Sequence, residues 1–172
     1  MKNLLFGLLA SMLICSNLSG QTDEINKNNS WLKFGVNLGV PTGSINNISN
    51  FVGGLELKGQ FMETDHVGIG LGVGYNHFFG KGVLGDFGTI PLGAFIRLYP
   101  NREGFFFGLD AGHSLVTNAG NLNGGFFVKP QLGYHNYNWN LFAFYNEVFR
   151  KPLNGGNIPH VGLGATYNIH FK

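Results

Sequence analysis

Cysteine and charge are both scarce in this 172-residue chain. Cys15 is the only cysteine, and it lies in an N-terminal segment that we expect to be removed. The mature chain would then have no disulfide, thiolate metal site or cysteine nucleophile. Charged residues make up only 12%, against ~25% in an average soluble domain. The formal net charge of +2 gives no basic patch, so nucleic acid is not an expected partner.

Glycine and phenylalanine dominate the composition. The chain contains 28 Gly and 17 Phe, and aromatic residues reach 15%. So many large apolar groups exclude a disordered chain. Glycine inside a helix costs ~1 kcal/mol relative to alanine, which argues against a helical bundle. The composition therefore favours β structure with close backbone contacts.

The N-terminal segment has the pattern of a secretory signal peptide. Lys2 supplies a positive start, and an apolar run follows over residues 4–14. This run is shorter than the ~20 residues of a membrane-spanning helix, and no later stretch is long enough either. We expect cleavage near Gly20. The chain then divides into a signal peptide at 1–20, a short N-terminal lead at 21–30 and one domain at 31–172.

From Trp31 onward, apolar residues alternate with small or polar ones, which is the period-two pattern of β-strands. A clear example runs from Val67 to Asn76, where the apolar residues are separated by Gly68, Gly70, Gly72 and Gly74. Eight such strands are predicted, at 31–41, 51–63, 66–79, 87–99, 104–116, 125–136, 140–150 and 160–171. The seventh mixes polarity on both faces around Tyr145 and Glu147, so its face assignment and a bulge there stay open.

Short and long connections alternate between the predicted strands. The tight links are 64–65, 100–103 and 137–139, and the long polar stretches are 42–50, 80–86, 117–124 and 151–159. Their Asn, Gly and Pro content is typical of turns and loops. This alternation predicts an antiparallel up-and-down order, with the long loops at one end and both termini at the other.

The face that points outward decides between a soluble carrier and a membrane barrel. An eight-stranded barrel has an interior just wide enough for side chains or one small ligand. The apolar faces, in which we include Phe105, Phe107, Phe126, Phe142 and Phe144, are too bulky for that interior. We therefore predict that they contact lipid, while glycine and polar residues point inward. Closure follows because hydrocarbon cannot satisfy an open sheet edge.

These features together resemble the small outer-membrane β-barrels of the OmpX and OmpA-transmembrane-domain type. The resemblance covers the mature chain and rests on the signal peptide, the glycine-rich strand Gly68 to Gly74, the loop alternation and the closing run 161–171. Family members usually end in an aromatic residue, whereas here Phe171 is followed by Lys172. The resemblance implies an all-β, eight-stranded antiparallel up-and-down transmembrane β-barrel in the outer membrane of a Gram-negative bacterium.

Two sets of residues are candidates for special roles. Strand alternation places seven charged residues on the glycine side, where we predict a paired network that fills the lumen: Lys33, Glu56, Lys58, Arg97, Asp110, Lys129 and Glu147. Four aromatic residues near the short-turn ends are predicted to form a belt at the membrane interface: Trp31, Tyr99, Tyr137 and Trp139.

We expect a structural or interaction role for a monomer in outer-membrane lipid, with no cofactor, metal site or catalytic residue assigned. Three alternatives stay open. A lipid A deacylase would use His113 and Ser114, although alternation points adjacent residues to opposite faces. A rearranged lumen network would give a narrow solute channel. Apolar loop residues would either bind an extracellular partner or cap the barrel mouth: Ile45, Ile48, Val83, Leu84, Phe87, Leu122, Leu153 and Ile158.

Overall fold

The computed structural model describes residues 30–81, 85–118, 124–151 and 156–170. The predicted signal peptide, with Cys15, and all of the lead except Ser30 lie outside the described residues, as do Phe171 and Lys172. No helix among the described residues is both long and apolar enough to cross a membrane.

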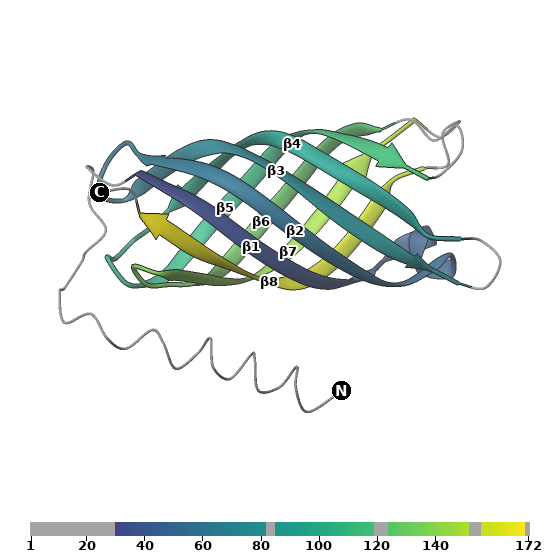
Figure 1. Cartoon of the computed structure of the whole chain (residues 1–172), viewed down its shortest axis with the longest axis horizontal. Helices are drawn as coiled ribbons and strands as arrows, with labels where there is room; N and C mark the ends of the chain where they lie inside the picture. Colours follow the sequence, from purple (N-terminus) through teal and green to yellow (C-terminus); the bar gives the residue numbers. More distant parts are fainter. Residues whose placement is uncertain (1–29, 82–84, 119–123, 152–155, 171–172) are drawn as a thin grey trace, which may run out of the picture.

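Eight antiparallel strands form one closed ring, in which each strand pairs with its neighbours in sequence and β1 pairs with β8 (Figure 1). The strands are β1 (Ser30–Pro41), β2 (Ser49–Met62), β3 (Val67–Gly80), β4 (Phe87–Leu98), β5 (Gly104–Thr117), β6 (Gly125–His135), β7 (Trp139–Phe149) and β8 (Ile158–His170). The predicted strands are confirmed to within two residues at each end. The fold class and strand order are confirmed with them.

The tight links and the long connections lie at opposite ends of the barrel (Figure 1). One long connection contains a short 3-10 helix, η2 (Gly43–Asn47), which packs Ile45 into the barrel mouth. The β1–β8 seam is regular, with partners running from Trp31 and His170 to Pro41 and His160. A register shift falls between Ser49 and Phe51 on β2, whereas β7 keeps one register against both neighbours.

Side chains alternate between the two faces of the wall, apart from the register shift at Ser49 and Phe51 on β2. On β1, Phe34, Val36 and Leu38 are 48%, 48% and 58% exposed, while Lys33 and Asn37 are buried. The same pattern continues around the ring, with Leu71 and Leu163 among the most exposed apolar side chains. A soluble monomer rarely exposes so large a contiguous apolar surface. The outside of this barrel is therefore suited to lipid, as the sequence predicts.

Two clusters of apolar and aromatic side chains close the lumen at its ends. The cluster toward the short turns consists of Trp31, Met62, Tyr99, Phe106, Phe142 and Phe144. The cluster at the loop end consists of Ile45, Val52, Phe78, Phe87, Phe127, Val148 and Ile158. Charged side chains lie against the rings of the first cluster: Lys33 Nζ is 5.0 Å from the Trp31 ring centroid, and Lys129 Nζ is 4.4 Å from that of Phe144.

The predicted orientation of Phe142 and Phe144 is wrong. Both side chains are 5% exposed and point into the lumen, while Leu141 and Tyr145 of the same strand face outward. The physical reason is size complementarity across the β7–β8 pair. Phe142 is opposite Gly164 and Phe144 is opposite Gly162, so each inward ring occupies space that a side chain on β8 would otherwise fill.

Candidate functional site in the barrel lumen

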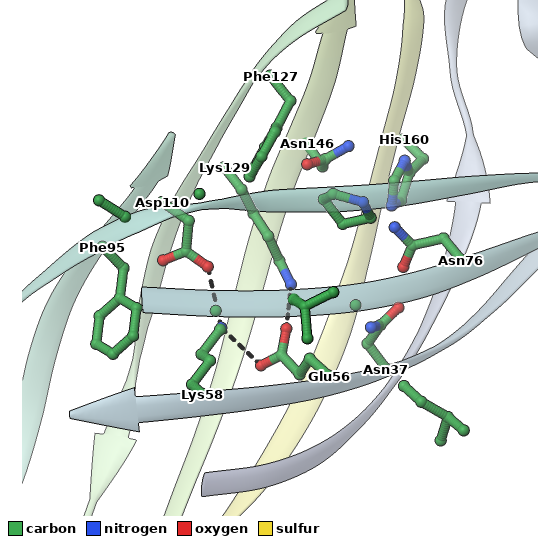
Figure 2. Close-up of a pocket in the computed structure, with 17 residues that line it drawn as sticks. Asn37, Glu56, Lys58, Asn76, Phe95, Asp110, Phe127, Lys129, Asn146 and His160 are labelled. Atoms are coloured by element: carbon green, nitrogen blue, oxygen red, sulfur yellow. Dashed lines mark hydrogen bonds and ion pairs between the residues drawn. The ribbon is translucent and has the colours of Figure 1, made fainter. Parts of the chain in front are cut away.

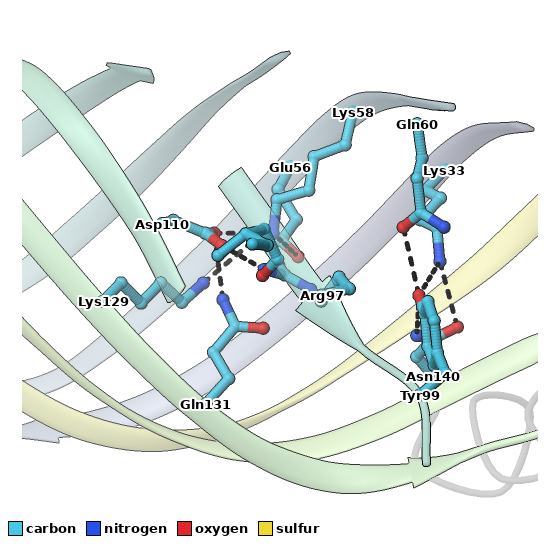
Figure 3. A network of polar contacts seen from close by, with 11 residues as sticks. Lys33, Glu56, Lys58, Gln60, Arg97, Tyr99, Asp110, Lys129, Gln131 and Asn140 are labelled. Atoms are coloured by element: carbon cyan, nitrogen blue, oxygen red, sulfur yellow. Dashed lines mark hydrogen bonds and ion pairs between the residues drawn. The ribbon is translucent and has the colours of Figure 1, made fainter. Parts of the chain in front are cut away.

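The lumen brings together charged residues from strands that lie on different sides of the ring. Glu56 and Lys58 come from β2, Arg97 from β4, Asp110 from β5 and Lys129 from β6. Each occupies an inward position of its strand and is at most 8% exposed. Figure 3 shows their side chains converging in one layer. The alternation of the sequence is sufficient to place them there.

Ion pairs run from wall to wall across this layer. Glu56 accepts from Lys58 Nζ and from Lys129 Nζ, both at 2.8 Å. Asp110 pairs with Lys58 Nζ at 3.0 Å and with Arg97 at 2.6 Å. Strands β2 and β6 are four positions apart in the ring of eight, so the Glu56–Lys129 pair spans the lumen. The two carboxylates and three cations form one connected network.

Neutral and aromatic side chains complete the network. The Gln131 amide donates to Asp110 Oδ2 at 2.9 Å. The Lys129 ammonium lies 4.4 Å from the ring centroid of Phe144, and the Arg97 guanidinium lies 4.8 Å from that of Phe95. Cation–π contacts of this kind stabilise a desolvated cation. The inward phenylalanines are therefore part of the site.

Lys33 forms a second, separate polar group toward the short turns (Figure 3). Its Nζ donates to Tyr99 Oη and Asn140 Oδ1, both at 3.3 Å, and lies 5.0 Å from the centroid of the Trp31 ring. Tyr99 in turn donates to Gln60 Oε1 at 3.1 Å. In the part of the chain that the structure describes, no ion pair joins Lys33 to a carboxylate. Neutral oxygens and an aromatic ring surround this buried ammonium instead.

The predicted inward position of Glu147 is wrong. Alternation along β7 turns it outward, where Tyr145 Oη donates to its Oε2 at 2.8 Å and Asn157 Nδ2 donates to its Oε1 at 2.7 Å. The error has the same origin as that for Phe142 and Phe144, because the even-numbered residues of β7 point inward and the odd-numbered residues point outward. Without Glu147, the buried charges described in the lumen are four cations and two carboxylates.

A small cavity with both polar and apolar lining residues lies on the loop side of the charge layer (Figure 2). Its volume is about 30 Å³, room for on the order of one or two water molecules. Asn37, Asn76, Asn146 and His160 line it beside Lys129. Asn37 Oδ1 and His160 Nδ1 have no hydrogen-bond partner in the structure. Within the described ranges, no group of three or more metal-ligating side chains comes together.

The predicted aromatic belt divides into two pairs. Trp31 and Tyr99 are 2% and 1% exposed and point into the lumen, so their assignment to the membrane interface is wrong. They share strand parity with Lys33 and Arg97, and parity rather than nearness to a strand end sets side-chain direction. Trp139 is half-buried on the outer face, where its ring meets that of Tyr167 edge-on. Tyr137 lies in the tight turn and contacts Trp31.

The residues of the enzyme and loop alternatives can also be located. His113 is exposed on the outer face and Ser114 is fully buried, so the two point to opposite faces, as alternation predicts. Ile45, Phe87 and Ile158 are buried in the cluster at the loop end, and Ile48 packs against it. The three buried residues lie in the barrel mouth, whereas Ile48 is only partly buried. Val83, Leu84, Leu122 and Leu153 lie outside the described residues.

Several residues of the lumen were not singled out from the sequence. Gln60, Gln131 and Asn140 are neutral and therefore carry no charge signal, although Gln60 and Gln131 share the parity of Lys58 and Lys129. Phe95 and Phe106 were missed because large rings were expected outside. Strand parity alone would have identified these residues, because every second residue of a strand points to the same face whatever its polarity.

Comparisons with known proteins place the fold. No family model matches the chain, and no curated protein matches it. The outer membrane protein OprG from Pseudomonas aeruginosa is similar in structure, with a TM-score of 0.53 and 16% identity, over 85% of this chain and 98% of that one. Neisserial surface protein A (NspA) has a TM-score of 0.53 and 16% identity, over 83% and 97% of the two chains. The fold is that of a small outer-membrane β-barrel.

A third structure with this outer-membrane β-barrel fold is Ail, the attachment invasion locus protein of Yersinia pestis. It has a TM-score of 0.52 and 18% identity, over 83% of this chain and 99% of that one. The near-complete coverage means that the described ring corresponds to a whole barrel. The likeness in fold to small outer-membrane barrels, inferred above from the sequence, is thus confirmed.

Proposed function

We propose that this protein is an integral β-barrel of the bacterial outer membrane with a structural or interaction role, and that its lumen conducts no solute. The observation that carries the proposal is the way the interior is filled. Two apolar clusters close its ends, and ion pairs cross its middle. The apolar exterior supports placement in lipid, and the long connections would then face the cell exterior.

A solute channel is the alternative that the same observation disfavours. A permeant molecule would have to displace the Glu56–Lys129 and Lys58–Asp110 pairs. Breaking a buried pair costs about 3–5 kcal/mol. It would also have to pass both apolar clusters, whereas the cavity between them holds about 30 Å³. A conformation in which the ion pairs are broken and both apolar clusters are open would therefore be rarely populated.

Planar-bilayer recording tests this proposal. Purified protein, shown by heat-modifiable gel migration to be folded, is expected to give no steady conductance. A variant with Phe106→Ala and Phe142→Ala, checked by the same gel, is the matched comparison because it thins the cluster toward the short turns. Sustained porin-like currents from the unsubstituted protein would contradict a filled lumen.

The deacylase alternative built on His113 has a separate test. Lipid A from cells with and without the protein is compared by mass spectrometry. We expect no acyl-chain difference that depends on His113, because its imidazole and the Ser114 hydroxyl lie on opposite faces of the wall. A difference abolished by His113→Ala would overturn this expectation.

A further inference from the structure

Three polar side chains form a hydrogen-bonded chain on the outer face of β3 near its loop end. Tyr75 Oη lies 3.1 Å from His77 Nδ1, and His77 Nε2 lies 3.1 Å from Asp86 Oδ2. The backbone N–H of Gly80 donates to the other carboxylate oxygen of Asp86 at 2.8 Å. All three side chains are accessible from outside, Tyr75 being 38% exposed. They play no part in the lumen network.

The chemistry of the three groups fixes the direction of the hydrogen bonds. The Gly80 N–H, and then the His77 imidazole, lower the pKa of Asp86, which keeps its carboxylate ionised. An ionised carboxylate only accepts hydrogen bonds, so His77 donates through Nε2–H. Neutral His77 therefore has its lone pair on Nδ1, where it accepts from the Tyr75 hydroxyl. A hydroxyl, a base and a group that orients the base are arranged as nucleophilic catalysis requires.

The depth of this group on the barrel matches the boundary of a lipid bilayer. β3 begins at Val67, next to a tight turn, and a tilted strand crosses the hydrocarbon in about 9–11 residues. Counted from Val67, that span ends close to Tyr75 and His77. The linkages that join acyl chains to a lipid headgroup lie at this boundary. The exposed ring of Phe79 meets that of His77 edge-on and packs against Phe51, so the two phenylalanines provide an apolar surface for an acyl chain.

A glycine on β4 makes room for a second hydroxyl. A Cβ placed on Gly88 would lie 2.7 Å from Thr117 Oγ1 and 2.8 Å from Tyr75 Oη. Both hydroxyls therefore approach the same point above the Gly88 backbone. The missing side chain at Gly88 thus lets the Tyr75 and Thr117 hydroxyls come close to each other on the outer face.

We propose that Tyr75, His77 and Asp86 form a catalytic site that hydrolyses carboxylic esters of membrane lipids. The Tyr75 proton passes to His77 Nδ1 as the phenolic oxygen attacks the acyl carbon. The ester C–O bond then breaks, and the departing alcohol takes the proton from His77. Water next attacks the acyl-tyrosine and gives a proton to His77. The acyl–tyrosine bond breaks, Tyr75 regains its proton, and a fatty acid is released.

The experiment uses the mature protein folded in nanodiscs, with fatty-acid release followed by mass spectrometry. Phospholipid and lipopolysaccharide nanodiscs are separate arms that distinguish the two sources of ester. A short-chain p-nitrophenyl ester in detergent micelles tests the chemistry without relying on the membrane placement proposed above. We expect Tyr75→Phe and His77→Ala to lower the rate by about 100-fold or more. Rapid quenching should trap an acyl group on Tyr75.

Matched controls separate catalysis from folding. Tyr145→Phe removes another outward tyrosine that is bonded to a carboxylate, Glu147, but has no histidine in the chain. It should leave the rate unchanged, as should His113→Ala. Heat-modifiable migration confirms that each variant is folded. A native rate no higher than those of both Tyr75→Phe and His77→Ala in every arm would overturn the site, and an unchanged rate in Tyr75→Phe with loss in His77→Ala would overturn the acyl-tyrosine step.

Asp86 acts through His77 and is a positioning residue. Asp86→Asn is expected to lower kcat with little change in KM, because the neutral amide no longer fixes the His77 tautomer. Asp86→Glu should restore part of kcat, since it returns a carboxylate. A purely structural tie between the loop and β3 would instead lower thermal stability and leave kcat of the folded fraction intact, which would contradict this role.

Discussion

Glu56 joins opposite walls of the lumen, because it accepts from Lys58 of its own strand and from Lys129 four strands away in the ring. Both cations are buried. Removing the negative charge leaves them to share Asp110 with Arg97. Buried charges are stable when paired and costly when a partner is lost. Lys33 is the opposite case, since neutral groups already surround it.

This contrast gives a paired prediction. Glu56→Gln should lower the free energy of unfolding by about 3 kcal/mol, the cost of an uncompensated buried charge. Lys33→Met should leave it unchanged or raise it by about 1 kcal/mol, because an apolar side chain of similar length replaces an ammonium without a carboxylate partner. Urea unfolding in detergent micelles, followed by tryptophan fluorescence, measures both variants.

Glu63→Gln is the control for the first of these changes, since Glu63 is exposed in a tight turn. An effect of Glu56→Gln no larger than that of Glu63→Gln would mean that the lumen pairs contribute no net stability. A loss of several kcal/mol in Lys33→Met would show that its hydrogen bonds outweigh the desolvation of its charge.

At the scale of strands, β7 and β8 fit together through residue size. The inward rings of Phe142 and Phe144 lie over Gly164 and Gly162 of the facing strand. A Cβ on Gly164 would come 2.5 Å from Phe142 Cζ. Glycine here keeps the lumen wide enough for the aromatic rings. The pairing explains how one strand can be rich in glycine while its neighbour points phenylalanine inward.

Gly164→Val is therefore expected to destabilise the barrel by about 1–3 kcal/mol through overpacking. Combining it with Phe142→Ala should recover part of that loss, because the removed ring leaves room for the new side chain. The double-mutant cycle is measured from urea unfolding midpoints. Gly59→Val is the matched control, since a Cβ on Gly59 meets nothing within 4 Å. Additive effects of Gly164→Val and Phe142→Ala would refute the size-complementarity account.

The strands were predictable from the sequence because alternation is a local property. The strand bounds and the strand order follow from alternating runs such as Val67 to Gly80 and from the turn and loop residues between these runs. The direction of β7 was not predictable from polarity, since Phe142 belongs inside only because Gly164 lies opposite. Trp31 and Tyr99 lie near strand ends, which predicted the membrane interface, but the parity of their strands points both side chains into the lumen.

The contacts within the candidate sites needed three-dimensional information. Alternation predicted that Glu56 and Lys129 both point inward, but their pairing depends on facing walls of a closed ring. The contact between His77 and Asp86 depends on how the β3–β4 connection returns to the strand. Nothing in the spacing of these two residues distinguishes a contact from two unrelated polar side chains.

At the scale of the molecule, closure of the ring is the condition for stability in lipid. The β1–β8 pairing leaves no strand edge open. Hydrocarbon cannot satisfy free backbone groups, each of which costs several kcal/mol. The ring should therefore unfold as a unit, because loss of one strand exposes two edges.

Gel migration provides the corresponding prediction. The unboiled protein should migrate faster than the boiled one in detergent, because the closed ring stays compact. A chain truncated before Ile158 lacks β8 and should migrate as unfolded under both conditions. The full chain treated in parallel is the control. A heat-modifiable band from the truncated chain would mean that seven strands close without the eighth.

Trp31 and His170 are paired partners across the β1–β8 seam. The start of the first strand and the end of the last strand are therefore neighbours in space, on the side of the tight turns (Figure 1). The gap between the end of β8 and the start of β1 thus occupies the position of a fourth tight link, like those that follow β2, β4 and β6. Circular permutation should be tolerated: a peptide linker joining the old ends, with new ends opened within Asn136–Asn138, would give the same cylinder with a different first strand.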